Sequence, residues 1–407
     1  MTTLINADTS GGLKMTSDTS GVLDIQSAGS TKLTVSSTGV DIPVISTING
    51  LTSINGGQVG GRRNLVINGE MQVSQRVGTT ATATANGSYL IDRFSTYVNG
   101  GGAYTVQQVT DTPAGFKNAA KVTITTADSS IAAGDYYVMQ YRAEGVDIAH
   151  LNCGTSDAET VTLSFWVKSS LTGNFGGAMR NGAADRNYPY LYNIAQANTW
   201  EKKSITLTLD TTGTWLTTTG QGLVFMWDFG SGTNFQGTAD QWQAGNFHSA
   251  ASQVKLIATN SSTWYVTGVQ LETGSTATDF EHKSFGEELS LCQRYYEKSY
   301  DYDVVAGTTT YIGMHLMGGN VAATAGTSHI SGPTIPFQVP KRDNPTIVAY
   351  DQAGNSGKCQ RFQLGSHNTD NQAISVQSIG TNNFRYITSS SSNSTGTQAH
   401  FTADSEL

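Results

Sequence analysis

Apolar and polar residues alternate one by one through much of the chain, which is the pattern of β-strands with one buried face. Val161, Leu163, Phe165 and Val167 alternate in this way with the residues of the opposite face. The same alternation recurs in three later segments, 205–209, 223–229 and 264–271. About eight to ten such strands, separated by turns and with no helical pattern between them, predict a jelly-roll β-sandwich over residues 62–283.

A ten-residue repeat occupies the start of the chain. Residues 7–15 are echoed by residues 17–25, and a weaker third copy places Leu33 and Val35 at the same offset. Each copy reads as a turn followed by a short strand with two apolar residues, and so thin a strand cannot form a core within one chain. We therefore expect residues 1–61 to form a stalk or attachment segment that sister copies or another protein cover. A flexible polar tail is the alternative.

A short helix is expected after the sandwich. Ser284 and Glu287 have the spacing of a capping box, and Leu289, Cys292 and Tyr296 form one apolar stripe. The pattern predicts a helix over 285–298, within a connecting segment 284–299. A helix of this length is stable only when it packs against other parts of the protein.

The remaining residues, 300–407, again have the pattern of strands. Four of the seven prolines fall in 332–347, and prolines this close together exclude both a helix and a central strand. We therefore expect an extended edge or crossing segment there. Strands at 347–350, 373–376 and 384–387 would complete a second, smaller β-sandwich.

Composition agrees with an all-β protein and excludes some partners. Only 13% of residues are charged and 45 are glycine, which suits twisted strands joined by tight turns. The net charge is −8 and no cluster of Lys and Arg occurs, so nucleic acid is not an expected partner. No apolar run approaches the length of a membrane span, and the first residues do not resemble a signal peptide. We expect no membrane insertion.

Cysteine and histidine spacing predicts neither a cofactor nor a metal. The three cysteines, Cys153, Cys292 and Cys359, lie far apart and do not form a disulfide framework or a zinc motif. Assembly in a reducing compartment is the simplest interpretation. The seven histidines are scattered without ligand spacing, and no calcium-loop pattern is present.

No catalytic residues are predicted. Hydrolysis of a glycan requires two carboxylates that flank a groove. Asp185, Asp210, Asp228 and Asp240 are available, but their Gly, Thr and Asn neighbours are typical of turns, where Asp binds loop amides. The chain also lacks a nucleophile elbow around Ser. We therefore expect a protein that is not an enzyme.

Aromatic residues give the stronger functional signal. Flat rings pack on the apolar faces of sugars, and side-chain amides bind sugar hydroxyls. The candidate glycan contacts are Trp215, Trp242, Tyr188, Tyr190 and Asn187, because they fall in or near predicted loops. The alternative for any one tryptophan is a place in the core or in a subunit interface.

One set of segments recurs in the same order in a known family. The segments are 64–71, 75–76, 92–94, 161–173, 198–201, 267–274 and 291–296. Over residues 62 to about 300 the chain resembles a family of tail-fibre and other virion structural proteins of marine and freshwater phages. This resemblance implies a jelly-roll module similar to carbohydrate-binding domains, in an appendage that is usually trimeric.

Together with the repeat, the resemblance implies a homotrimeric tail fibre of a bacteriophage virion, assembled in the host cytoplasm. We expect residues 1–61 to bind other virion proteins and the sandwich to attach to host cell-surface glycans by multivalent, non-catalytic binding. Two alternatives remain open at this stage. One is a capsid decoration or head-fibre protein, and the other is a glycan-degrading tailspike.

Overall fold

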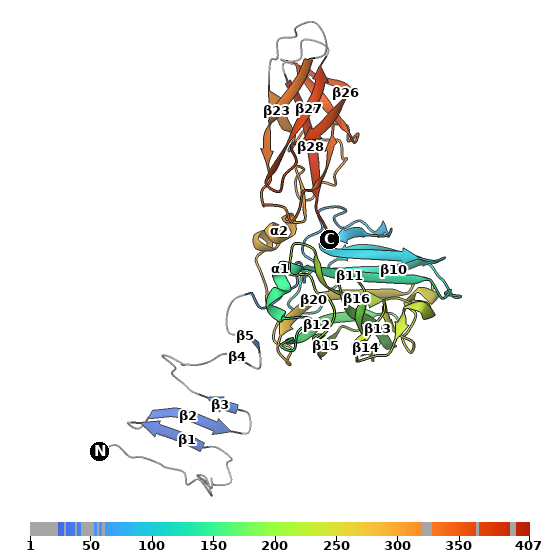
Figure 1. The fold of residues 1–407 in the computed structure, drawn as a ribbon, viewed down its shortest axis with the longest axis vertical. Helices are drawn as coiled ribbons and strands as arrows, with labels where there is room; N and C mark the ends of the chain where they lie inside the picture. Colours follow the sequence, from blue (N-terminus) through green and yellow to red (C-terminus); the bar gives the residue numbers. More distant parts are fainter. Residues whose placement is uncertain are drawn as a thin grey trace. The chain divides into compact units, whose positions relative to one another are not determined.

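The computed structural model describes residues 62–318, 328–363, 366–390 and 396–407, together with five short strands nearer the N-terminus. It confirms the prediction of an all-β fold, in which sandwiches dominate and α2 is a short helix (Figure 1). The chain divides into two compact units, Met1–Ile54 and Asn55–Leu407.

The first unit contains a three-stranded antiparallel sheet of β1 (Leu23–Ser27), β2 (Ser30–Ser36) and β3 (Gly39–Asp41). The register pairs Leu23 with Val35, so the second and third copies of the repeat lie on adjacent strands. The first copy, residues 7–15, lies outside the described residues. The short strands β4 (Ser53–Ile54) and β5 (Gly57–Gln58) follow along the chain.

The second unit begins with a β-sandwich of two sheets. The six-stranded sheet has the order β15-β12-β20-β10-β9-β6. Its strands are β6 (Thr82–Ala83), β9 (Ala103–Val109), β10 (Ala119–Thr126), β12 (Thr160–Ser169), β15 (Glu201–Thr208) and β20 (Thr263–Thr273). In Figure 1 this sheet can be followed by the labels β10, β12 and β20.

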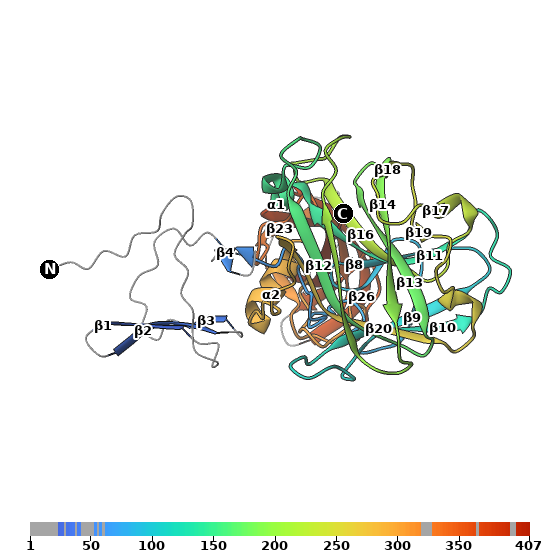
Figure 2. The same ribbon diagram turned by 90° about the horizontal axis from the view of Figure 1, so that it is seen from below.

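The seven-stranded sheet has the order β18-β14-β13-β16-β11-β8-β7. Its strands are β7 (Ser88–Ile91), β8 (Phe94–Asn99), β11 (Tyr136–Glu144), β13 (Gly173–Asn181), β14 (Arg186–Ile194), β16 (Gln221–Asp228) and β18 (Gln243–Ala244). Two short parallel strands, β17 (Gln236–Gly237) and β19 (Ser249–Ala250), form a loop structure next to β14 and β13 (Figure 2).

The core between the two sheets follows the sequence alternation. Val161, Leu163, Phe165 and Val167 are fully buried, as their spacing predicts. Trp227 of β16 lies at the centre of this core, with its ring centroid 5.4 Å from that of Trp264 on β20. The apolar faces of the two sheets therefore cover each other within a single chain.

Short helical segments interrupt the sandwich at its ends. They are α1 (Gly145–Ile148) and three 3₁₀ turns at Ala149–Leu151, Thr233–Phe235 and Leu256–Ala258. Of the described residues, no helix has both the length and the apolar character that a membrane span requires.

The predicted connecting helix is present but ends early. It is α2 (Phe285–Gln293), and the Ser284 hydroxyl caps it by accepting a hydrogen bond from the Glu287 amide at 3.3 Å. The prediction that the helix continues to residue 298 is wrong. Tyr296–Lys298 form β21, which pairs with β28, because the edge of that strand offers backbone partners that a helix would leave unused.

The C-terminal sheet is built around one strand, β28 (Gly396–Asp404), which pairs with four others. These are β21, β22 (His315–Gly318), β24 (Thr346–Tyr350) and β25 (Lys358–Gln363). The sheet continues through β26 (Ser366–Gln377) and β27 (Asn383–Ser390) to β23 (Ser328–Pro336). In the described part, β23 lies at the edge of the sheet and carries Pro333 and Pro336, as the proline spacing predicts.

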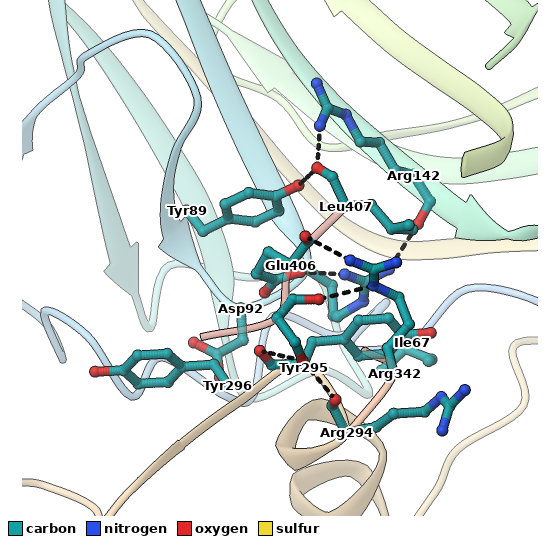
Figure 3. A network of polar contacts seen from close by, with 12 residues as sticks. Ile67, Tyr89, Asp92, Arg142, Arg294, Tyr295, Tyr296, Arg342, Glu406 and Leu407 are labelled. Atoms are coloured by element: carbon teal, nitrogen blue, oxygen red, sulfur yellow. Dashed lines mark hydrogen bonds and ion pairs between the residues drawn. The ribbon is translucent and has the colours of Figure 1, made fainter. Parts of the chain in front are cut away.

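A buried polar network joins the segment after β28 to the sandwich (Figure 3). The fully buried Arg93 forms an ion pair with Glu406, and its guanidinium carbon lies 3.4 Å from the centre of the Tyr295 ring. Burial acts to lower the pKa of Arg93, but the Glu406 carboxylate and the tyrosines around the guanidinium together raise it well above its usual value. The Tyr89 hydroxyl donates a hydrogen bond of 2.6 Å to the main-chain oxygen of Leu407.

The same network contains many residues of the segments that carry the sequence resemblance. Arg76 pairs with Asp404 at 2.9 Å, and Arg294 pairs with Glu144 at 2.6 Å. Tyr295 also donates to the Glu144 carboxylate, at 2.8 Å. Since these groups are paired with one another and largely buried, their role in the described structure is to hold the fold together.

Candidate functional site

Three of the five sequence-predicted contacts come together at the margin of the sandwich core. The Trp242 ring lies 5.6 Å from the Trp215 ring and 5.4 Å from the Tyr188 ring, both edge to face. Trp215 is only 9% exposed, whereas Trp242 and Tyr188 are half-buried. The indole N–H of Trp242 donates a hydrogen bond to the Thr208 carbonyl at 2.8 Å, which fixes the orientation of the ring.

The other two predicted contacts lie inside the protein. Tyr190 is fully buried, and its hydroxyl donates to the Met226 carbonyl at 2.8 Å. Asn187 is also fully buried, and its amide donates to the Phe247 carbonyl at 2.5 Å. The structure does not bring these two side chains to the aromatic group around Trp242. A glycan-contact role for the five residues stays a prediction.

A pocket of about 300 Å³ lies elsewhere, on the outer face of the seven-stranded sheet. Three rows of residues cross this face, and the strand register defines them. One row places Tyr97 of β8 beside Val138 of β11, and a second places Gln140 of β11 beside Met226 of β16. In the third row, Arg142 of β11 and Arg180 of β13 flank Val224 of β16, which is the direct partner of both.

The floor of the pocket is apolar. Val138, Ala178, Val224 and Met226 form a small buried cluster on this outer face, and Tyr97 packs against it. Val138 and Tyr97 are the members of this group that line the pocket, and the other three are buried beneath the side chains around it.

An aromatic wall rises from one side of the pocket. Tyr136 of β11 contacts Phe235 and His248 edge to face, at ring distances of 5.1 and 5.4 Å. Phe235 stacks on His248 at 4.6 Å. Burial lowers the pKa of His248 to about 3, and the charge of Arg180 acts in the same direction, so this imidazole is neutral near pH 7.

Polar groups complete the lining. With its amide oxygen turned toward Arg142, Gln140 accepts hydrogen bonds from Nε and Nη2 of that residue at 2.9 Å. The Arg180 Nη1 group donates to the Asn246 Oδ1 atom at 2.9 Å. The residues that line the pocket include no Asp and no Glu.

Sequence reasoning did not identify this pocket. Tyr97 and Tyr136 lie within alternating strands, where an aromatic residue is equally typical of the core. Phe235, Asn246 and His248 come from the segment between β16 and η3 (Leu256–Ala258), and only the tertiary structure places that segment over β11 and β13. The sequence held one indication of this surface. Polar residues occur at alternate positions within 136–144, and this spacing marks the outward face of that strand.

A second cavity, of about 560 Å³, lies where the C-terminal sheet meets the sandwich. Its charged residues are Arg76, Asp404 and Glu406, and the two carboxylates pair with the arginine. The charged groups of this cavity are therefore paired with one another. Among the described residues, no group of three or more His, Cys, Asp or Glu side chains is placed to hold a metal ion.

Asp228, one of the turn carboxylates considered above, is deeply buried on the same sheet face as the pocket. Its Oδ1 atom accepts a hydrogen bond from the Gly230 amide at 2.6 Å, while Oδ2 is buried without a hydrogen-bond partner among the described residues. Burial raises the pKa of Asp228 to about 6, against the effect of the hydrogen bond from the Gly230 amide. Its neighbour across the sheet is Gly176. A larger residue would clash there, because its Cβ atom would lie 1.6 Å from the Ser249 Oγ atom.

Asp228→Asn is expected to stabilise the protein at pH 7.5. The folded Asp228 holds its proton more tightly than the unfolded chain, so wild-type stability falls as pH rises from about 4 to about 6 and then levels off. The amide removes this loss, a gain on the order of 2 kcal/mol at pH 7.5 that shrinks toward pH 4.

Denaturant unfolding of both proteins at pH 4.5 and pH 7.5 measures this difference. Asp157→Asn, at an exposed turn position, is the matched control and should change little at either pH. A gain for Asp228→Asn that is equal at the two pH values would contradict a buried, proton-holding Asp228.

The described fold is thus an all-β protein with a sandwich that carries a pocket on its outer sheet face. No family model matches the chain, and no curated protein matches it.

Solved structures with distant similarity include the enzymatically active domain of tailspike protein 4 of bacteriophage CBA120. It is 13% identical over 52% of this chain and 21% of that chain, with a TM-score of 0.26. This chain therefore spans about a fifth of the tailspike chain that it matches.

Carbohydrate-binding modules are also among the matches. A CBM4 module is 14% identical over 49% of this chain and 99% of its own length, with a TM-score of 0.26. TmCBM61, in complex with β-1,4-galactotriose, is 7% identical over 52% of this chain and 99% of its own length, with a TM-score of 0.27. At identities this low, the matches assign no ligand to this chain.

Proposed function

We propose that this protein is a non-catalytic glycan-binding protein of a bacteriophage particle and that the outer-face pocket holds the sugar. The observation that carries the proposal is the pocket lining, in which aromatic rings, Val138 and side-chain hydrogen-bonding groups converge on one cavity. Sugars have both apolar ring faces and hydroxyl rims, and this combination of groups matches both.

The proposed binding uses different parts of the pocket for different parts of the sugar. The Tyr136 and Phe235 rings present flat apolar surface, and Asn246 and Gln140 present amides that can both donate and accept. His248 is neutral, and its Nδ1 atom lies 3.2 Å from the Ser231 hydroxyl, which fixes the ring within the aromatic wall. The pocket is small enough for one or two sugar units, so binding by a single site is weak.

Weak single sites suit a multivalent particle. We propose a homotrimeric fibre in which residues 1–61 bind other virion proteins and three sandwiches face the host cell surface. Three linked sites raise the effective concentration of each one and retain a particle that a single site would release. The sequence resemblance over residues 62 to about 300 supports the virion role and the trimer.

The proposal includes the absence of catalysis, since the lining provides neither of the two carboxylates that glycoside hydrolysis requires. A glycan-degrading tailspike is the alternative in which new reducing ends would accumulate when the purified protein is incubated with host polysaccharide. A head-fibre or capsid decoration protein could use the same pocket, and imaging of intact particles would distinguish it from a tail fibre.

Tyr136→Ala is expected to weaken glycan binding by about 3- to 10-fold, which corresponds to the loss of one aromatic contact. Binding of the full chain to an array of neutral and acidic oligosaccharides measures this effect, and the mass of the same sample in solution tests the trimer. The matched control is Tyr265→Ala, a half-buried tyrosine on β20 of the other sheet, which should bind as wild type does. Equal binding by wild type and Tyr136→Ala would remove the pocket as the sugar site.

A further inference from the structure

Two arginines in the outer-face pocket have no Asp or Glu partner in the described part of the chain. Arg142 and Arg180 lie on either side of Val224 and belong to strands two positions apart in the sheet, so their backbones are about 10 Å apart. Neither forms an ion pair with an Asp or Glu side chain among the described residues. By contrast, Arg93, Arg186 and Arg294 each pair with a carboxylate.

The surroundings of Arg180 leave part of its hydrogen-bonding capacity unused. Its Nε atom is buried and has no hydrogen-bond partner in the described part of the chain. Burial lowers the pKa of Arg180 to about 10, and the charge of Arg142 acts in the same direction. A guanidinium that is partly removed from water beside a second cation is destabilised until an anion reaches it.

Arg142 is held in place by three oxygen acceptors. Its Nη2 group donates to the Tyr97 hydroxyl and its Nη1 group to the main-chain oxygen of Leu407. The Gln140 amide oxygen, turned toward Arg142, accepts from Nε and Nη2. These contacts orient the guanidinium without neutralising it by a side-chain carboxylate. The two planar groups are therefore preorganised cations on the same sheet face, next to the aromatic wall.

We propose that the pocket selects an acidic sugar, one that carries a carboxylate or sulfate group, with the anion between Arg142 and Arg180 and the sugar ring against Tyr136 and Phe235. This inference rests on the proposed function of the pocket. Arginine matches both anions, because its fork of N–H groups forms paired hydrogen bonds with planar carboxylates and with sulfate oxygens. A neutral sugar would leave the Arg180 guanidinium without an anionic partner.

The test compares oligosaccharides that differ only in charge. The full chain is assayed against galacturonate and sialic acid oligosaccharides beside their methyl esters, and against a sulfated galactan beside the same galactan after desulfation. Wild type is expected to prefer the charged member of at least one pair by about tenfold or more, since a charge-assisted hydrogen bond contributes this much. The preferred pair identifies carboxylate or sulfate as the anion.

Arg180→Gln is expected to remove that preference and to leave binding of the neutral member within about twofold, because only the charge-assisted contacts are lost. Arg180→Lys tests the geometry, since it keeps the charge and loses the planar fork. Arg62→Gln is the matched control outside the pocket, where Arg62 lies 3.6 Å from Asp147, and it should keep the wild-type preference. Thermal unfolding of each variant shows whether it is folded.

The outcomes separate the two proposals. If neutral and charged members bind equally and Tyr136→Ala weakens both, the anion inference fails and the glycan site stands. If Arg62→Gln reduces the preference as much as Arg180→Gln does, the preference reflects general electrostatic attraction, and the inference is overturned. If wild type binds no member of any pair, the glycan site and the anion inference both fail.

Discussion

Arg93→Met is expected to lower the free energy of unfolding by about 3–5 kcal/mol, because it removes the closer of the two arginines that pair with the buried Glu406 carboxylate and leaves only Arg76, at 3.5 Å. Arg93 is completely buried, and its partner Glu406 is only 5% exposed at its side chain. Methionine keeps much of the length of the side chain and its packing on Tyr295, so the loss is one of charge and hydrogen bonds. Denaturant unfolding at pH 7 measures the change.

A double-mutant cycle separates the ion pair from the packing. Glu406→Gln combined with Arg93→Met removes both charges, and the double variant should recover part of the stability that Arg93→Met loses. Arg62→Met, which breaks a half-exposed pair with Asp147, should cost less than about 1 kcal/mol. Equal losses in Arg93→Met and Arg62→Met would show that the junction does not depend on this ion pair.

Trp215→Ala is expected to destabilise the sandwich by about 3–5 kcal/mol, the usual cost of removing a large buried aromatic side chain. Trp215 is 9% exposed and belongs to the main core cluster, and its indole donates to the Thr212 carbonyl at 3.0 Å. The same substitution at the half-buried Trp242 should lower the free energy of unfolding by less. Thermal or denaturant unfolding of the two variants makes the comparison.

This difference decides how the predicted sugar contacts can be tested. A loss of binding in Trp215→Ala would report a weakened fold, whereas Trp242→Ala tests a surface contact in a folded protein. If Trp215→Ala and the wild type have the same midpoint of denaturant unfolding, Trp215 does not support the core.

Local patterns in the sequence predicted much of the fold. The alternation at Val161–Val167 specified a strand with one buried face, because residues two apart in a strand point the same way. The capping spacing at Ser284 located the start of α2, because the cap depends on residues within one turn. The prolines at 333 and 336 predicted an edge strand, because proline cannot donate to a neighbouring strand.

The features that sequence reasoning missed depend on distant residues. The end of α2 is set by pairing between Tyr296 and Asp404, which no local pattern reports. The pocket depends on the register that places Arg142 and Arg180 on either side of Val224. Strand register is fixed when the sheets pack together, so neither arginine could be assigned to a shared site beforehand.

The order of the strands along the chain also determines when the protein can finish folding. Arg93 and Glu406 are 313 residues apart, so at synthesis rates of about 5–20 residues per second roughly 15–60 s pass before the arginine can meet its partner. The C-terminal sheet has the same delay, because β28 pairs with four strands that all precede it. Until residue 406 has been synthesised, Arg93 lacks this carboxylate partner, and the sandwich must persist without that ion pair.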